Sequence, residues 1–229
     1  MEKSFLGNLL HLSDPTLPIG GYTHSNGLET YVQLGLVNSK DTAASYVRHM
    51  LQYNMKYNDG ALMKLAYEAT QKSDIMSLIA LDQECTALKA PREIRQASQK
   101  LGLRLIKIFR RSVKQDMLAE FEAQVQQRNA DSHYCVVFGM LAQLLRIPIE
   151  EAVYAYYYNA AIGMITNAVK LVPLGQLDGQ DILFELHDYL RELVRETLDI
   201  DRKLVGLCNI AFDIRCMQHE RLYSRLYMS

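Results

Sequence analysis

Apolar residues recur every three or four positions along nearly the whole chain, which is the period of an α-helix with one buried face. Such runs begin near Asn38, Ser73, Pro91, Ser132 and Pro148, and two more cover residues 183–198 and 204–214. No segment alternates apolar and polar residues between hairpin turns, as a half-buried strand would. The pattern therefore predicts an all-α protein.

Proline and acidic residues mark several helix starts. Pro91 suits the first turn of a helix, where its missing N–H costs nothing. Glu150 and Glu151 suit the positive end of the long apolar helix that follows Pro148. No internal repeat, low-complexity tract or Pro/Ser-rich linker divides the chain. We therefore predict one domain over residues 1–229, a bundle of roughly eight to ten helices that ends in a polar helical tail.

Two stretches interrupt the helical pattern. Residues 13–25 contain two prolines and a Gly-Gly pair, which predict a flexible loop. In residues 173–180, Pro173 and Gly175 predict the end of the long helix. Loops carried on rigid helices often hold functional residues. Both stretches are therefore candidate contact sites.

Composition narrows the class of protein. Apolar residues make up 49% of the chain, so a packed core is expected rather than disorder. The formal net charge is −1, without a basic block of the kind that binds nucleic acid. The four cysteines form no C-x-x-C pair, and residues 1–11 lack the apolar run of a signal peptide. These features predict a cytoplasmic protein with reduced thiols.

One segment raises the question of a membrane span. Lys170 is the single charged residue between Ala152 and Val172, a length that would cross a bilayer. However, Tyr158 and Asn159 would then lie deep in hydrocarbon, where polar groups are costly. The sequence favours a central buried helix of a globular bundle, and we expect no membrane contact.

Familiar catalytic and metal-binding motifs are missing from the sequence. There is no phosphate-binding G-x-x-x-x-G-K-[ST] loop, no H-E-x-x-H and no G-x-S-x-G. Cys216 and His219 would share a helix face, but two ligands are too few for a tight site. His24 and His133 are isolated and are interpreted as structural. We predict no catalytic residue, metal site or cofactor.

Four separated segments carry a resemblance to a known family. Residues 14–29 read DPTLPIGGYTHSNGLE, residues 92–102 read REIRQASQKLG, residues 167–180 read NAVKLVPLGQLDGQ and residues 219–229 read HERLYSRLYMS. In this order they resemble the UreF family of urease accessory proteins. The family patterns are P-x-L-P-[IV]-G-G-[FY]-[ST]-x-S-x-G-L-E, E-x-R-x-A-S-x-x-x-G and a terminal H-E-x-L-x-x-R-L-[FY]-x-S.

The match is specific because four ordered segments carry it, whereas one Gly-Gly loop alone would be a weak signal. The departures from the family patterns are mild. Lys170 stands where many members have arginine, which keeps the charge and loses a planar bidentate donor. His24 occupies a position that is often aromatic.

The resemblance implies a function. UreF proteins are all-α, commonly dimeric, non-enzymatic scaffolds that join UreD (UreH in some organisms) and the GTPase UreG. That assembly acts on the urease apoprotein and promotes nickel insertion linked to GTP hydrolysis. The expected partners of this chain are therefore UreD, UreG and the urease apoprotein, with a homodimer inside the complex. Nucleotide and most nickel chemistry would belong to UreG, whose GTPase activity this chain would modulate.

The candidate partner-binding residues come from the four segments. They are Pro15, Pro18, Gly20, Gly21, Tyr22, Ser25, Gly27, Glu29, Arg92, Glu93, Arg95, Lys170, Pro173, Gly175, Gln176, Gln180, His219, Glu220, Arg225, Leu226 and Tyr227. Residues 217–229 are expected to form an amphipathic helix that lies in a groove of a partner, with Arg225 as an anchoring cation. Gln176 and Gln180 carry donors and an acceptor suited to a partner's backbone.

Other interpretations stay open at this point. An all-α enzyme could use the Gly20-Gly21 loop as a substrate clamp, with His24 or Glu29 as acid–base group. A peripheral membrane protein could use the Tyr-rich helix. The glycine pair could be only a tight turn, the Pro173 stretch only a helix stop and the charges of residues 92–107 only a solvated face. The sequence does not assign surfaces to UreG or UreD, locate the dimer contact, or say whether Cys216 and His219 ever contact nickel.

Overall fold

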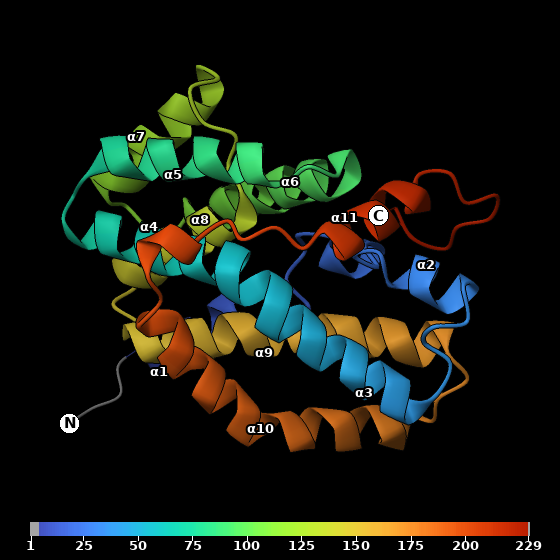
Figure 1. Ribbon diagram of the computed structural model, residues 1–229. Coiled ribbons are helices and arrows are strands. Elements are labelled where there is room, and N and C mark those ends of the chain that lie inside the picture. The colour runs from blue at the N-terminus through green and yellow to red at the C-terminus, as the bar shows by residue number, and fades with distance from the viewer. Residues whose placement is uncertain (1–4, 229) are drawn as a thin grey trace.

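The computed structural model describes residues 5–228, and within that range all regular structure is helical (Figure 1). The α-helices are α1 (Leu6–Leu12), α2 (Leu28–Gln33), α3 (Lys40–His49), α4 (Ala61–Gln71), α5 (Ile75–Leu88), α6 (Arg92–Phe109), α7 (Asp116–Gln126), α8 (Tyr134–Leu144), α9 (Ile149–Leu171), α10 (Gln176–Leu198) and α11 (Ile210–His219). Short 3-10 turns, η1 and η3, cover Gly21–Thr23 and Arg202–Leu204. The predicted all-α class is confirmed.

A π-helical segment joins α3 to α4 without a break. This segment, η2, covers Met50–Gly60, so that α3, η2 and α4 form one rod across the front of the molecule in Figure 1. Counting the rod once, residues 5–228 contain ten helices, within the range that the sequence predicts. Wide π-helical turns often lie at functional sites, and η2 lines the main cavity described below.

Helices α8 and α9 form the centre of the core. Every residue from Cys135 to Ala142 of α8 is buried, and α4 and α6 pack against this helix. Gly139 makes the α4 contact possible, because a Cβ atom there would overlap the carbonyl oxygen of Met63. On the other side of the core, α10 runs beside α9 and buries Leu186 and Leu190 (Figure 1). The helices thus share one apolar core.

Most predicted helix starts are correct to within one or two residues. The N-cap of α3 is Ser39, whose hydroxyl accepts a hydrogen bond from the Thr42 N–H. The N-cap of α5 is Asp74 rather than Ser73, because the Asp74 carboxylate accepts from the Ser77 N–H at 2.9 Å. Pro91 is itself the N-cap residue of α6. The pattern did not signal α1, α2, α4 or α7.

Two sequence-based predictions near the C-terminus are wrong. Residues 204–214 do not form one helix, because Gly206 has a left-handed φ of +87° and Asn209 caps a new helix, α11. The predicted helical tail ends at His219, and residues 220–228 follow an irregular path. Residues 220–228 are called the C-terminal segment below; the remaining residue of the predicted tail, Ser229, lies outside the described part of the chain.

The second predicted loop is shorter than expected. Helix α9 ends at Leu171 and α10 already begins at Gln176, so only four residues separate them. The Asp178 carboxylate accepts a hydrogen bond from the Gly175 N–H at 2.8 Å, which holds the start of α10. Gln176 and Gln180 are therefore helical residues rather than loop residues.

The long apolar helix is part of the core. Ten residues of α9 are buried in the bundle, among them Tyr156 and Tyr157. In residues 5–228, no helix combines the length and the hydropathy that crossing a bilayer requires.

Candidate functional site

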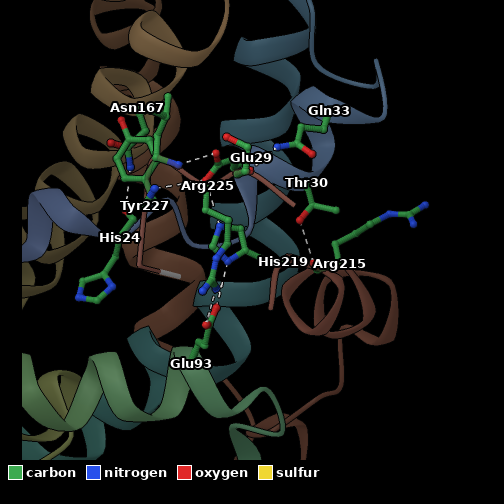
Figure 2. Close-up of polar contacts among 12 residues, drawn as sticks. His24, Glu29, Thr30, Gln33, Glu93, Asn167, Arg215, His219, Arg225 and Tyr227 are labelled. Carbon is green, nitrogen blue, oxygen red and sulfur yellow. Dashed lines mark hydrogen bonds and ion pairs between the residues drawn. The ribbon is translucent and has the colours of Figure 1, made fainter. Parts of the chain in front are cut away.

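A buried carboxylate, Glu29 of α2, connects the N-terminal part of the chain to its C-terminal segment (Figure 2). Glu29 is 3% exposed. One oxygen, Oε1, accepts a hydrogen bond from the Leu226 N–H at 2.8 Å. The other, Oε2, accepts from the Tyr227 N–H at 3.3 Å and lies 3.1 Å from Nε2 of His219. Glu29 therefore holds the backbone of a segment almost 200 residues away.

His219, the last residue of α11, lies between two carboxylates. Its Nε2 faces Glu29, and its Nδ1 lies 3.0 Å from Oε2 of Glu93 on α6. Both ring nitrogens can donate to carboxylates only when the imidazole carries both protons. His219 is 1% exposed, so its ring nitrogens need such hydrogen-bond partners.

Arg225 adds a further partner to this group. Its Nη1 donates to Oε1 of Glu93 at 2.7 Å. Glu93 therefore contacts both His219 and Arg225, and His219 bridges Glu93 to Glu29. Burial alone would raise the pKa of Glu93, but hydrogen bonds and charges from His219 and Arg225 outweigh burial and lower it. We call these four residues the Glu29 cluster.

Further contacts fix the C-terminal segment on both sides of the cluster. The Met228 N–H donates to the carbonyl oxygen of Thr23 at 2.9 Å, and Nε2 of Gln33 donates to the carbonyl oxygen of Ser224 at 3.1 Å. Tyr227 is buried at 9% exposure, whereas Leu226 is 78% exposed. The segment therefore lies on its own chain with Tyr227 facing inward and residues 223–226 exposed.

The two arginines predicted on α6 have different surroundings. Nη2 of Arg92 pairs with Oε2 of Glu220 at 2.9 Å, in an exposed position where an ion pair adds little stability. Nη1 of Arg95 donates to the carbonyl oxygens of Lys89 and Ala90, which follow the end of α5. Arg95 is thus used inside the chain, and Arg92 and Glu220 help to hold the C-terminal segment.

The Pro/Gly-rich loop, residues 13–25, packs against α6 and α9. Nη1 of Arg104 on α6 donates to the Ile19 carbonyl oxygen at 2.7 Å, and Nδ2 of Asn167 on α9 donates to the His24 carbonyl oxygen at 2.8 Å. Gly20 has a left-handed φ of +86°, and a Cβ there would overlap the Arg104 guanidinium. Gly21 has open space around the Cβ position. Whether this loop is flexible stays a prediction.

The two glycines of the loop can be separated by mutation. We expect Gly20→Ala to destabilise the protein by about 1–2 kcal/mol, because the left-handed backbone disfavours any Cβ and the Arg104 contact is lost. We expect Gly21→Ala to change stability by less than about 0.5 kcal/mol. Urea unfolding of both variants measures the difference. Equal effects would show that the left-handed turn at Gly20 is not needed.

The predicted partner-binding residues divide by exposure. Those buried in the chain are Gly20, Ser25, Gly27, Glu29, His219 and Tyr227, and those exposed are Pro15, Pro18, Gly21, Tyr22, Arg92, Lys170, Pro173, Gly175, Gln176, Gln180, Arg225 and Leu226. Glu93, Arg95 and Glu220 are intermediate. The buried set holds the loop, α2 and the C-terminal segment together, so only the exposed set offers side chains to a partner directly.

Five exposed candidates form a second group at the junction of α9 and α10. They are Lys170, Pro173, Gly175, Gln176 and Gln180. Within residues 5–228, we find no hydrogen bond or ion pair between this group and the Glu29 cluster. The junction is held instead by Lys40 of α3, whose Nζ pairs with Asp181 at 2.7 Å. The structure therefore does not bring all candidates into one site.

A cavity of about 330 Å³ lies behind the loop. Its lining includes Gly21, Tyr22 and His24 from the loop, together with Asp59 and Lys89 deeper inside. Burial, followed by the nearby charges of Lys100 and Arg104, lowers the pKa of His24. Glu29 does not line this cavity, and its carboxylate is occupied by the C-terminal segment. The clamp enzyme that would pair His24 with Glu29 therefore gains no support from the geometry.

Cys216 and His219 are the two potential metal ligands that the sequence places on one helix face. Both ring nitrogens of His219 face carboxylates, and the sulfur of Cys216 packs against Gly27, where a Cβ would approach it to 2.8 Å. In the described part of the chain, no three or more His, Cys, Asp or Glu side chains are grouped as a metal site would require.

Several residues that build the site escaped the sequence analysis. Arg104 and Gln33 contact the loop and the C-terminal segment through backbone carbonyls, a role that leaves no motif. Thr30 likewise donates its hydroxyl to the Arg215 carbonyl oxygen at 3.1 Å, joining α2 to α11. Asn167 had a signal, because it opens the third of the four recognised segments.

The fold and the site define an all-α protein whose C-terminal segment closes on a buried cluster shared with α2 and α6. The family model of UreF matches residues 37–187. The chain is 52% identical over 224 residues to a urease accessory protein UreF of Actinobacillus pleuropneumoniae, covering 98% of this chain and 99% of that protein. It is 49% identical to one of Haemophilus influenzae strain PittEE, covering 98% and 95%. A Bacillus sp. strain TB-90 protein of the same name is 32% identical over 222 residues, covering 97% and 98%. The chain belongs to the UreF family of urease accessory proteins.

Proposed function

We propose that this chain is a non-enzymatic scaffold for urease maturation in the cytoplasm. It binds UreD (UreH) and, as a homodimer within that complex, presents the GTPase UreG to the urease apoprotein, where GTP-dependent nickel insertion follows. Its effect on UreG is to favour one conformational state of the GTPase and so to time hydrolysis. Membership of the UreF family supports this role.

The observation that carries the proposal is the order of the C-terminal segment. Buried Glu29 holds the backbone of Leu226 and Tyr227, while Leu226, Tyr223 and Met228 remain exposed. Large apolar side chains on a fixed backbone can bind a partner without the entropy cost of ordering a free tail. Exposed apolar residues of this size are also typical of the centre of protein interfaces. We assign UreD to this segment.

The exposed residues at the α9–α10 junction support a second contact surface. Lys170, Gln176 and Gln180 have no part in the Glu29 cluster and offer a cation and two amides to another protein. Leu177, which follows Gln176 in the first turn of α10, is 80% exposed. A scaffold that joins several components needs more than one such surface.

Replacing Leu226 by Asp tests the assignment of UreD. The side chain is 78% exposed, so Leu226→Asp should leave the stability of the isolated chain within about 0.5 kcal/mol of the original. At an interface centre, the buried charge should weaken UreD binding at least about tenfold. Co-expression of the tagged chain with UreD and UreG, followed by sizing of the eluted complex, measures the loss.

The matched control is Met76→Asp. Met76 is 71% exposed on α5, and the start of that helix lies on the opposite side of Figure 1 from the C-terminal segment. This variant should keep the complex intact. Deletion from Met217 onward is a poorer test, because it also removes buried His219. If Leu226→Asp elutes with UreD as well as the control does, the C-terminal segment is not the UreD contact.

A further inference from the structure

Two buried thiols face each other between α5 and α8, outside the partner-binding candidates. The sulfur atoms of Cys85 and Cys135 lie 3.6 Å apart, and both residues are 0% exposed. A disulfide bond is about 2.05 Å long, so the two sulfurs need to move together by only about 1.5 Å. They are 50 residues apart in sequence, which is why no C-x-x-C motif announces them.

The main cavity borders one of the two thiols. Cys85 belongs to its lining, and Cys135 does not. The same lining reaches Tyr22 and Cys208, which are exposed at the surface. A molecule that enters the cavity of about 330 Å³ therefore comes nearer to Cys85 than to Cys135, and it reaches the Cys85 sulfur, which is 0% exposed, when the packing around it opens locally.

Charged groups around Cys85 favour its thiolate. Lys89 follows one helical turn later, and its Nζ pairs with Asp59 at 2.8 and 2.9 Å. The hydrogen bond shared with Cys135, opposed by burial and helped by the charge of Lys89, lowers the pKa of Cys85. The same hydrogen bond and burial raise the pKa of Cys135 well above its ordinary value. Cys85 is therefore the nucleophile of the pair.

We propose that Cys85 and Cys135 form a peroxide-reactive dithiol that closes to an intramolecular disulfide. The Cys85 thiolate attacks one oxygen of hydrogen peroxide, so that an S–O bond forms, the O–O bond breaks and hydroxide leaves. The Cys135 sulfur then attacks the Cys85 sulfenic acid, the S–S bond forms and the hydroxyl group leaves as water with the Cys135 proton. Peroxide is reduced to two water molecules by the two thiols.

This site is independent of the scaffold role. Neither cysteine lies in the Glu29 cluster or at the α9–α10 junction, and the disulfide would tie α5 to α8 beside the cavity. The remaining two cysteines serve as internal references. Cys208 is exposed, and Cys216 is a free cysteine buried at 3% exposure.

The test uses the full chain with Cys208→Ser, which removes the exposed thiol. The folded protein is treated with hydrogen peroxide, alkylated, and digested for mass spectrometry. We expect a peptide pair joined through Cys85 and Cys135, lighter by two hydrogen atoms and separated by dithiothreitol. Cys216 should stay reduced over the same time.

Two variants show which of the two cysteines reacts with peroxide first. With Cys135→Ser, Cys85 should stop at the sulfenic acid, which dimedone traps. With Cys85→Ser, Cys135 should remain reduced. The proposal is overturned if the peptide pair does not form in the Cys208→Ser chain, or if Cys216 is oxidised as fast as Cys85, since the reaction would then pass through the unfolded chain. Because the first measurement keeps both core cysteines, a variant that fails to fold does not remove the test.

Discussion

Replacing Glu29 by Ala is expected to release the C-terminal segment and to destabilise the chain by about 3 kcal/mol, the cost of breaking a buried, hydrogen-bonded charge group. The change removes the acceptor of the Leu226 and Tyr227 N–H groups and one carboxylate partner of His219. Buried His219 then keeps one carboxylate partner, Glu93, instead of two. Urea unfolding measures the stability, and amide hydrogen exchange at Leu226 and Tyr227 reports the release.

Two matched variants separate the cluster from a general surface effect. Glu29→Gln keeps the shape and one acceptor oxygen but removes the negative charge, so its loss should lie between those of the original chain and Glu29→Ala. Glu220→Ala breaks only the pair with exposed Arg92 and should cost less than about 1 kcal/mol. Unchanged protection of the Leu226 amide in Glu29→Ala would show that the carboxylate does not hold the segment.

The same variant links the cluster to the proposed function. If the fixed backbone presents Leu226 to UreD, Glu29→Ala should weaken the complex although Glu29 itself is buried. Leu226→Asp should weaken it without changing the stability of the chain. A UreD complex lost in Leu226→Asp and kept in Glu29→Ala would mean that the side chain matters but its prior order does not.

Replacing Gly102 by Ala should be the most damaging single methyl addition in the core. A Cβ on Gly102 of α6 would overlap the carbonyl oxygen of Ser132. That backbone has little freedom to move, because the buried Asp82 carboxylate accepts the N–H groups of Ser132 at 3.0 Å and His133 at 2.7 Å. We expect a loss of about 3 kcal/mol, at the upper end for overpacking, measured as a lower urea midpoint with an unchanged m-value.

Gly163 of α9 is the matched control. It is also helical, but a Cβ there would meet no atom within 4 Å. Gly163→Ala should therefore stabilise the protein by about 0.5–1 kcal/mol, because alanine restricts the unfolded chain and favours the helix. If Gly102→Ala proved as stable as the original chain, α6 and the residues before α8 would have to pack less closely than the structure shows.

Local sequence rules predicted most of the architecture. Helical periodicity located α3, α5, α6, α8, α9 and α10, since neighbours three and four residues apart decide which face is apolar. The rule failed for residues 204–214. The apolar spacing continues through Gly206, but the left-handed backbone at that residue interrupts the helix. Leu204, Leu207 and Ile214 fit the predicted apolar stripe, although they are 45%, 50% and 47% exposed.

In the candidate site, too, some features depend on residues close together in the chain and others depend on tertiary packing. The sequence alone determined the all-α class, the irregular loop at residues 13–25 and the four segments that identify the family, because each depends on residues close together in the chain. Only the tertiary structure decided that Glu29, Glu93, His219 and Arg225 form one cluster and that the C-terminal segment folds back on it. Glu29 and His219 are 190 residues apart, and a hydrogen bond over that separation depends on how every helix between them packs, which no local spacing records.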